Sequence, residues 1–394
     1  MHLSYTPDQE KLQHELRAYF AGLMTGEERR QLRHGYSAVA ATEAYRAVVR
    51  RLGEDGWLGI GWPREIGGQG RTMVEQAIFN DEATSANVPT PLLTINSIGP
   101  AIAAHGTDEQ RRTLVQGILE GRVHFAIGYS EPESGTDLAS LRTRAVREGD
   151  EYVINGQKLW TGMMEAADYI WLAVRTDPDV PRHKGISILV VPRYAPGVES
   201  ARMRTLGDNS IAAVSFTDVR VPVENCIGGE NNGWAMITGQ LNSERVALVS
   251  SAHLERGLVN VTAWAKEQKN PDGTRLIDRG WVRTALARVK ADVEFLRVLN
   301  RKLATAVDAG TLNAADASSA KVFGSELMGR GARTLAEVAG SDAVFTDDDP
   351  AAILGGSMAK GVASSNVMTF IGGVTAIQRD LIAQFGLGLP RVKR

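Results

Sequence analysis

Residues 128–145 read GYSEPESGTDLASLRTRA and residues 151–162 read EYVINGQKLWTG, and these neighbouring stretches decide the fold. Short runs of alternating or β-branched residues surround them, and the pairs Gly149-Asp150 and Asn155-Gly156 provide turn signals between runs. Such a pattern is typical of short strands joined by tight turns. We therefore predict a compact β domain that extends over roughly residues 123–228.

The sequence on both sides of this β domain predicts helices. Apolar residues recur at helical spacing before it, and the same period returns after Gly233 with breaks at 270–275 and 340–350. Strands and helices do not alternate along the chain, so a doubly wound parallel sheet is not expected. We predict an α+β protein with an N-terminal helical domain over 1–122, the β domain over 123–228 and a C-terminal helical domain over 229–394.

The N-terminal region contains several more specific signals. Thr107 is followed three residues later by Gln110, which predicts a capped helix start. The stretch GIGWPREIGGQG at 59–70 is too rich in glycine and proline for anything but a loop. Further N-terminal helices are expected over residues 9–20, 42–52 and 74–84.

Composition narrows the class of protein. The chain has 394 residues, of which 43% are hydrophobic and 23% charged, and its formal net charge is −2. This balance gives no reason to expect a nucleic-acid partner, and no apolar run is long enough to span a bilayer. The start lacks the pattern of a signal peptide. One cysteine and seven scattered histidines predict neither an internal disulfide nor a metal site. A soluble cytoplasmic protein is expected.

Common nucleotide and hydrolase motifs are missing from the sequence. It contains no G-x-G-x-x-G after a strand, no Walker loop and no G-x-S-x-G elbow. The GGQG at 67–70 is better interpreted as a turn than as a phosphate cradle. A nucleotide cofactor, if one binds, is therefore expected to bind outside the dinucleotide-binding fold.

The two stretches at 128–145 and 151–162 together resemble the flavin-binding signature of the acyl-CoA dehydrogenase family. The resemblance covers essentially the whole chain, including the GWP…GGQG loop and IQRDLIA…GLGLPR near the C-terminus. LNSERVALVS, NPDGTRLID and DASSAKVFG are similar to the catalytic α-type chains of actinobacterial α2β2 enzymes that act on steroid side-chain thioesters. The resemblance implies the acyl-CoA dehydrogenase fold, with a central β-barrel and a C-terminal four-helix bundle, and FAD-dependent α,β-dehydrogenation of an acyl-CoA.

The resemblance also implies a set of flavin-binding residues. Backbone N–H groups and hydroxyls near Ser130 are suited to the flavin ring edge and pyrophosphate. Trp160 is expected against the isoalloxazine face. Pattern alone favours Trp160 as a barrel core residue and Ser130 as a turn former, and the length of the match to the family reverses this preference. The expected cofactor-binding residues are Ile127, Gly128, Tyr129, Ser130, Thr136, Trp160, Gly162 and Gly340.

A carboxylate on an apolar helix face is the strongest catalytic candidate. Trp234, Ile237, Leu241 and Leu248 follow helical spacing, and Glu244 falls on the same face. Burial raises the pKa of a carboxyl group and makes the carboxylate a stronger base. The spacing alone fits a buried ion pair with a distant arginine equally well.

The resemblance favours the catalytic interpretation of Glu244. Many family members carry the base in a Tyr-Glu-Gly-Thr sequence before the IQR-type helix, where this chain has Gly372. A minority branch places the base at the position that Glu244 matches. The resemblance therefore implies that Glu244 removes the α-proton, while the Gly372 N–H polarises the thioester oxygen.

Departures from the family pattern bear on cofactor binding and assembly. Gly162, Val374 and Ala376 replace side chains that normally bind flavin, which predicts weaker retention of FAD. An Arg-x-Thr-Phe element that supports a neighbour's flavin is missing, and NPDGTRLID offers only Arg275. The resemblance implies a hetero-oligomer with a second acyl-CoA dehydrogenase-like chain, or else a homo-oligomer, and electron-transfer flavoprotein as acceptor. A non-catalytic subunit and a flavin oxidase or monooxygenase are the rival functions.

Overall fold

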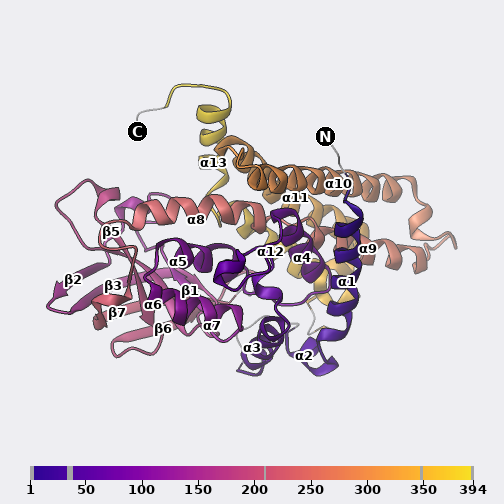
Figure 1. The fold of residues 1–394 in the computed structure, drawn as a ribbon. Coiled ribbons are helices and arrows are strands. Elements are labelled where there is room, and N and C mark those ends of the chain that lie inside the picture. The colour runs from indigo at the N-terminus through magenta and orange to yellow at the C-terminus, as the bar shows by residue number, and fades with distance from the viewer. Residues whose placement is uncertain (1–3, 33–38, 208–209, 347–348, 392–394) are drawn as a thin grey trace. The chain divides into compact units, whose positions relative to one another are not determined.

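The structure is a computed structural model that describes residues 4–32, 39–207, 210–346 and 349–391, with only the backbone described at 39 and 241–248. It forms two compact units (Figure 1). The β unit comprises Gly22–Arg71 and Pro89–Glu244. The helical unit comprises Met1–Ala21, Thr72–Val88 and Arg245–Arg394. Each is described separately below.

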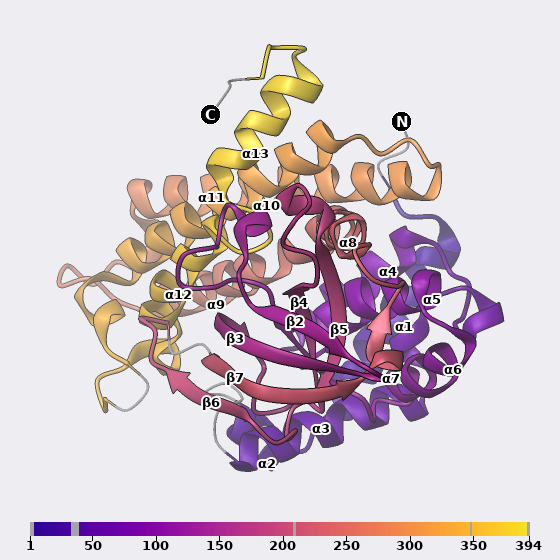
Figure 2. The same cartoon turned by 90° about the vertical axis from the view of Figure 1, so that its left-hand side faces the viewer.

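The β unit is built around one eight-stranded sheet. Its strands pair in the order β6-β7-β3-β2-β4-β5-β8, and β1 pairs with β4 (Figure 2). The sheet is mixed, because β4 runs parallel to β1 and β2 whereas the other pairs are antiparallel. The strands are β1 (Phe125–Gly128), β2 (Arg144–Glu148), β3 (Glu151–Gly162), β4 (Tyr169–Arg175), β5 (Ile186–Pro192), β6 (Val198–Met203), β7 (Ile211–Pro222) and β8 (Cys226–Ile227).

One predicted turn is wrong. Asn155-Gly156 lies inside strand β3, where the register against β7 shifts between Ile154 and Gly156. Gly156 has a φ of 146°, and a Cβ there would lie 2.7 Å from the Cα of Thr143. The glycine therefore permits a bulge and a close backbone approach, which are further uses of glycine in a strand. Gly149, with a φ of 64°, does form the predicted turn between β2 and β3.

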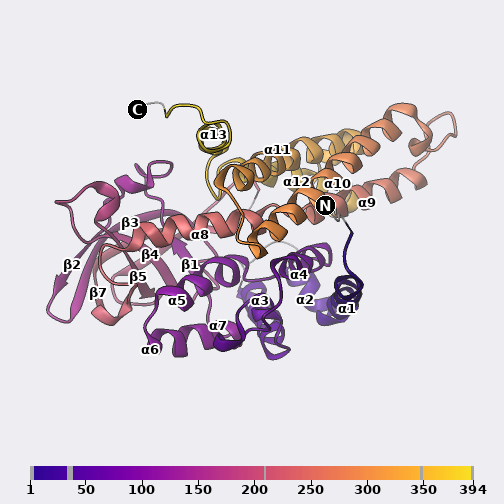
Figure 3. The ribbon, with the colours of Figure 1, turned by 45° about the horizontal axis from the view of Figure 1, so that its top comes forward.

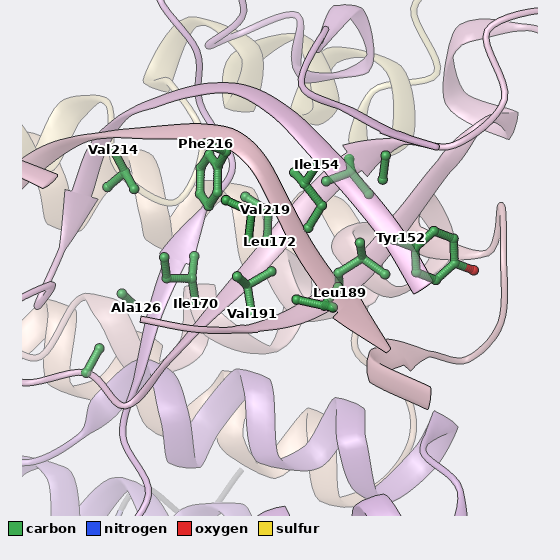
Figure 4. Packing of buried hydrophobic residues seen from close by; sticks show 14 of the residues in the cluster. Ala126, Tyr152, Ile154, Ile170, Leu172, Leu189, Val191, Val214, Phe216 and Val219 are labelled. Atoms are coloured by element: carbon green, nitrogen blue, oxygen red, sulfur yellow. The ribbon is translucent and has the colours of Figure 1, made fainter. Parts of the chain in front are cut away.

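Apolar side chains fill the interior of the sheet (Figure 4). Leu172 on β4 and Leu189 on β5 are register partners, and both are fully buried. Strand β4 is buried along nearly its whole length, as expected for a strand covered on both faces. By contrast, β6 is mostly exposed, and its polar sequence VESARM gave no strand signal.

Short helices complete the β unit. The predicted cap at Thr107 is confirmed, since its side chain accepts from the Gln110 N–H and Gln110 binds back to the Thr107 backbone. The loop at 59–70 contains only short turns. The helices are α2 (Gly26–Gln31), α3 (Val39–Glu54), α5 (Gly99–His105), α6 (Asp108–Gln110), α7 (Gln116–Leu119) and α8 (Gly233–Leu248), the last of which continues beyond the unit.

The helical unit packs long helices around a second apolar core (Figure 3). Helices α10 and α11 contact each other along their lengths, and Phe295 and Phe323 form an edge-to-face pair at 4.8 Å. Its helices are α1 (Pro7–Leu23), α4 (Met73–Ser85), α9 (Ala252–Glu267), α10 (Gly280–Asp308), α11 (Ala314–Ala339), α12 (Ser357–Ser365), η12 (Asn366–Thr369) and α13 (Thr375–Leu381).

The order of elements confirms the predicted α+β fold class, with helices before and after a central β region. The proposed domain boundaries after residues 122 and 228 stay a prediction. In the part of the chain that the structure describes, no helix is long and apolar enough to cross a membrane.

Candidate active site

Strand pairing places Ser130 directly beside Leu159, the residue before Trp160. Strand β1 ends at Gly128, and the carbonyl of Ser130 accepts a 2.8 Å hydrogen bond from the N–H of Leu159 on β3. A Cβ at Gly128 would lie 2.9 Å from Leu172 Cδ1, so a side chain would disturb this packing. Two predicted flavin-binding segments that are 30 residues apart in the sequence are thus neighbours in the sheet.

A buried ion pair fixes the backbone of this segment. Lys158 is fully buried, and its Nζ lies 2.8 Å from Glu131 Oε1 and donates to the Tyr129 carbonyl at 3.0 Å. The Glu131 carboxylate also accepts from the N–H groups of Arg142 and Thr143. Burial lowers the pKa of Lys158 to about 8, although Glu131 opposes this shift. Burial alone would raise the pKa of Glu131, but Lys158 and the hydrogen bonds lower it overall.

Trp160 is not a core residue, so that interpretation of the sequence is wrong. Between Lys158 and Thr161 the register against β7 shifts, so Leu159 and Trp160 form a bulge. Trp160 has a φ of 65°, which is unusual for a residue with a side chain, and its side chain is 57% exposed. Left-handed backbone at such a residue costs about 1–2 kcal/mol, and strain of this kind clusters at binding sites. The bulge presents an aromatic surface outward.

Gly162 follows Trp160 by two residues, and Thr136 lies in the loop after Ser130. Thr136 is exposed in the loop after Ser130, where the Ser134 hydroxyl donates to the Asp137 carbonyl at 2.8 Å. An ideal Cβ at Gly162 would meet only the carbonyl of Ser210, at 3.9 Å. Packing therefore leaves room for a side chain at position 162 and does not require glycine there.

A polar cavity of about 370 Å³ adjoins the same loop. Arg142, Arg144, Arg175 and Arg182 line it, together with Glu131. Arg175 is 9% exposed and donates to backbone carbonyls, while Arg144 forms no ion pair with a described residue. Guanidinium groups bind phosphate oxygens well. The sequence interpretation missed this cavity because Arg142 and Arg144 are more than 30 residues from Arg175 and Arg182 in the sequence.

Helix α8 contacts the flavin-candidate segment through a buried glutamine. Gln240 Oε1 accepts from the Tyr129 hydroxyl and, at 3.2 Å, from Trp171 Nε1. Trp171 Nε1 also donates to the Tyr129 hydroxyl at 3.0 Å. Gln240 is 6% exposed, so this side of α8 faces the protein interior.

The predicted apolar face of α8 is confirmed where its side chains are described. Ile237 is fully buried and Trp234 is half-buried. The backbone is helical through Leu248, so position 244 lies one turn beyond Gln240 on the same face. The side chains of residues 241–248, including Glu244, lie outside the described residues, and the assignment of Glu244 as the base stays a prediction.

Gly372 and Gly340 belong to the helical unit. Gly372 and Gly373 have φ values of 62° and 96° in the loop between η12 and α13. Among the described residues, no backbone hydrogen bond has the Gly372 N–H as donor, and its role toward the thioester oxygen stays a prediction. Gly340 ends helix α11 with a φ of 78°.

Apart from Gly162, the departures from the family pattern lie in the same unit. Val374 precedes helix α13, and its carbonyl accepts from the Gln378 N–H at 3.0 Å. Ala376 is exposed on the first turn of that helix. Arg275 is engaged locally, because its Nε lies 2.9 Å from Asp278 Oδ2. Among the described residues, no cluster of metal-binding side chains is present.

Family comparisons cover most of the chain. Three models match: the acyl-CoA dehydrogenase N-terminal domain over residues 6–122, the middle domain over 126–219 and the C-terminal domain over 231–387. Acyl-CoA dehydrogenase FadE26 of Mycobacterium tuberculosis is 49% identical, with 100% of both chains covered. Acyl-CoA dehydrogenase FadE29 of the same organism is 44% identical, also over 100% of both chains.

Solved structures are also similar to the chain over its full length. The chain is similar to one in the crystal structure of the ChsE4-ChsE5 complex from Mycobacterium tuberculosis, with 49% identity, full coverage of both chains and a TM-score of 0.93. It is also similar to one in the Tcur3481-Tcur3483 steroid ACAD, with 43% identity, full coverage and a TM-score of 0.93. The chain belongs to the acyl-CoA dehydrogenase family and is an oxidoreductase.

Proposed function

We propose that this acyl-CoA dehydrogenase uses FAD to introduce an α,β double bond into a bulky acyl-CoA thioester. The observation that carries the proposal is the exposed, strained Trp160, which follows the Leu159 that pairs with Ser130, because an aromatic side chain held outward offers a stacking surface for a flat ring. Purified protein should be yellow and should reduce an artificial electron acceptor in the presence of the right acyl-CoA. Colourless, inactive protein under all conditions of assembly would contradict the proposal.

The residues present fit a flavin. Trp160 would support the isoalloxazine ring, while the Ser130 and Thr136 hydroxyls and nearby N–H groups would bind polar ring atoms and the pyrophosphate. Arg142 and Arg182 in the cavity pair with Glu133 and Asp137, so Arg144 is the arginine that would offer positive charge to phosphate groups of the cofactor or of CoA. When bound, the flavin accepts the hydride from the substrate's β-carbon.

Two groups of the protein would act on the substrate. Glu244 would remove the α-proton, and its place on the same face of α8 as buried Gln240 supports a carboxylate with a raised pKa. The Gly372 N–H would donate to the thioester oxygen and stabilise the negative charge that develops there.

Oxygen, rather than a protein acceptor, would act as oxidant in an oxidase or monooxygenase, so turnover under air without an acceptor tests that rival.

The substrate class rests on the relatives. One similar structure is that of a steroid ACAD, and we infer a steroid side-chain thioester as substrate, with a branched fatty acyl-CoA as the alternative. A panel of acyl-CoAs that includes steroid side-chain, branched and straight-chain thioesters would test the choice. Preference for a straight-chain substrate would contradict it.

We further propose a heteromeric assembly, with electron-transfer flavoprotein as acceptor. The sequence NPDGTRLID offers only Arg275, which pairs locally with Asp278, so a second chain with an intact Arg-x-Thr-Phe element would supply the missing contact. A bound anion without a cationic partner is costly. The FAD-to-protein ratio should rise on co-expression with such a chain. A fully flavinated, active homo-oligomer would exclude this assembly.

A non-catalytic role within such an assembly is the second candidate. The exposed Ala376 and the absence of a side chain at Gly162 favour it, because both positions lack hydrogen-bonding groups for flavin. Glu244→Gln in the co-expressed complex separates the two functions. Loss of turnover supports catalysis by this chain, whereas unchanged turnover would support the silent role.

A further inference from the structure

Helix α11 carries a lysine whose side chain is fully buried. Lys321 is 0% exposed, and Ser318 and Ser325 on the same face of the helix are also 0% exposed. Lysine is almost never fully buried unless its ammonium group has a partner. The position of that partner therefore indicates what the lysine holds in place.

The partner is a carbonyl at the end of a helix. Lys321 Nζ donates a hydrogen bond to the carbonyl of Met368, which lies in η12 directly after helix α12. The last carbonyls of a helix lack donors within the helix and carry partial negative charge. Lys321 thus caps the C-terminal end of α12–η12.

The chain turns away from this cap into the glycine loop, residues 370–374. The N–H groups of Phe370 and Ile371 both donate to the Val367 carbonyl, at 3.0 and 3.2 Å. Gly372 and Gly373 then adopt left-handed backbone. Met368 is therefore an anchored carbonyl only four residues before the Gly372 N–H.

The same helix also holds the other end of the loop. Arg379 on α13 lies 2.6 Å from Glu326 on α11, with side chains 54% and 39% exposed. Exposed ion pairs contribute little because water screens them. Of these two contacts between α11 and the loop ends, the buried Lys321 contact is the stronger constraint.

We propose that Lys321 is a positioning residue that fixes the direction of the Gly372 N–H toward the thioester oxygen of the substrate. The proposal rests on the proposed function, in which Gly372 polarises that oxygen. Lys321 itself does not touch the substrate. It acts through the helix end that determines where the glycine loop begins.

The test compares Lys321→Met with the matched control Arg379→Met in the flavin-loaded complex. Misplacement of a polarising donor should lower kcat roughly 10- to 100-fold and leave KM within about threefold. The second readout is the infrared carbonyl stretch of bound cinnamoyl-CoA, isotopically labelled at the thioester carbonyl. Hydrogen bonding lowers this frequency, so it should return toward the unbound value in Lys321→Met. Arg379→Met should retain the wild-type frequency.

A second variant tests the proposal if Lys321→Met does not fold. Lys321→Gln keeps a donor with shorter reach, so it should give an intermediate carbonyl frequency and an intermediate kcat. A wild-type frequency and kcat in a folded Lys321→Met or Lys321→Gln variant would overturn the proposal. Failure of the proposed function would look different, because the wild-type complex itself would then leave the carbonyl frequency of cinnamoyl-CoA unchanged.

Discussion

Two lysines among the described residues are fully buried, and their ammonium groups are stabilised in different ways. In the β unit, Lys158 pairs with the Glu131 carboxylate, which also accepts two backbone N–H groups. In the helical unit, Lys321 binds the carbonyl of Met368 at a helix end. One lysine fixes a strand and the loop beside it, whereas the other fixes the start of a glycine loop.

The difference teaches how the two parts of the candidate site are held. Around Ser130 the backbone is constrained by a charged pair, strand pairing and a bulge, so a flat cofactor would meet a prepared surface. The described contacts around the Gly372 loop include the buried Lys321–Met368 hydrogen bond, the exposed Arg379–Glu326 pair and left-handed glycines. We therefore expect that removal of one side chain around Ser130 lowers stability more than activity. Removal of one side chain that holds the Gly372 loop should lower activity more than stability.

The largest effect is expected at neither lysine but on helix α8. Glu244→Gln should lower kcat roughly 10²- to 10⁴-fold, because an amide cannot accept the α-proton. FAD content and thermal unfolding should not change. Glu267→Gln, an exposed change on α9, is the matched control. Near-normal turnover in Glu244→Gln would remove it from the mechanism.

Breaking the Lys158–Glu131 pair should have the largest effect on stability. Lys158→Met leaves a buried carboxylate without its counter-charge, which costs about 3–5 kcal/mol. Lys321→Met leaves only a carbonyl without a partner, at a cost of about 1–3 kcal/mol. Urea unfolding of both variants, with the exposed Lys184→Met as control, measures the difference. Equal losses for both lysines would show that the carboxylate does not determine the cost.

A buried histidine offers a third case, in which burial prevails over a neighbouring charge. Burial and, to a lesser degree, Arg46 lower the pKa of His124 to about 4, although Asp168 opposes the shift. The unfolded chain then binds the proton more tightly than the folded one between pH 4 and the ordinary value of 6.5. His124 should therefore reduce stability as the pH falls through this window, by on the order of 3 kcal/mol at most.

Replacement of this histidine tests whether His124 lowers or raises the free energy of unfolding as the pH falls. His124→Phe keeps an aromatic ring against Tyr45 and removes the titrating group. Its unfolding free energy should fall less than that of the wild type between pH 7 and pH 5 in urea titrations. The exposed His105→Phe should retain the wild-type slope. A steeper fall in His124→Phe would mean that the histidine is charged in the folded state.

The sequence predicted the fold well because its signals are local. Alternation, turn pairs and the Thr107 cap each act within a few residues, and the structure confirms the order of elements that they indicate. Strands β6 and β8 were missed because one is polar and exposed and the other has two residues. The placement of Asn155-Gly156 failed because the same residues serve turns and bulges.

The candidate site was predicted only in part, for a related reason. Ser130 and Trp160 were named from a motif, but nothing in the spacing indicated that Trp160 faces outward on a bulge. The Lys158–Glu131 pair joins residues 27 apart, and pairing of this kind leaves no periodic pattern. The arginine cavity is likewise assembled from separate segments.

The smallest effect should come from a pair of glycines that differ in what their backbone requires. Gly162 has room for a side chain, whereas Gly372 has a φ of 62°. Gly162→Ser restores a hydroxyl near Trp160 and should increase FAD retention by a few-fold, which corresponds to about 1 kcal/mol for one added hydrogen bond. Gly372→Ser should leave FAD retention unchanged and lower stability by about 1–2 kcal/mol, because left-handed backbone disfavours a side chain. The same strain opposes Gly372→Glu as a means of restoring activity to Glu244→Gln. Fluorescence titration with FAD measures the first change and urea unfolding the second. Unchanged FAD affinity in Gly162→Ser would mean that the missing hydroxyl at this position does not limit cofactor binding.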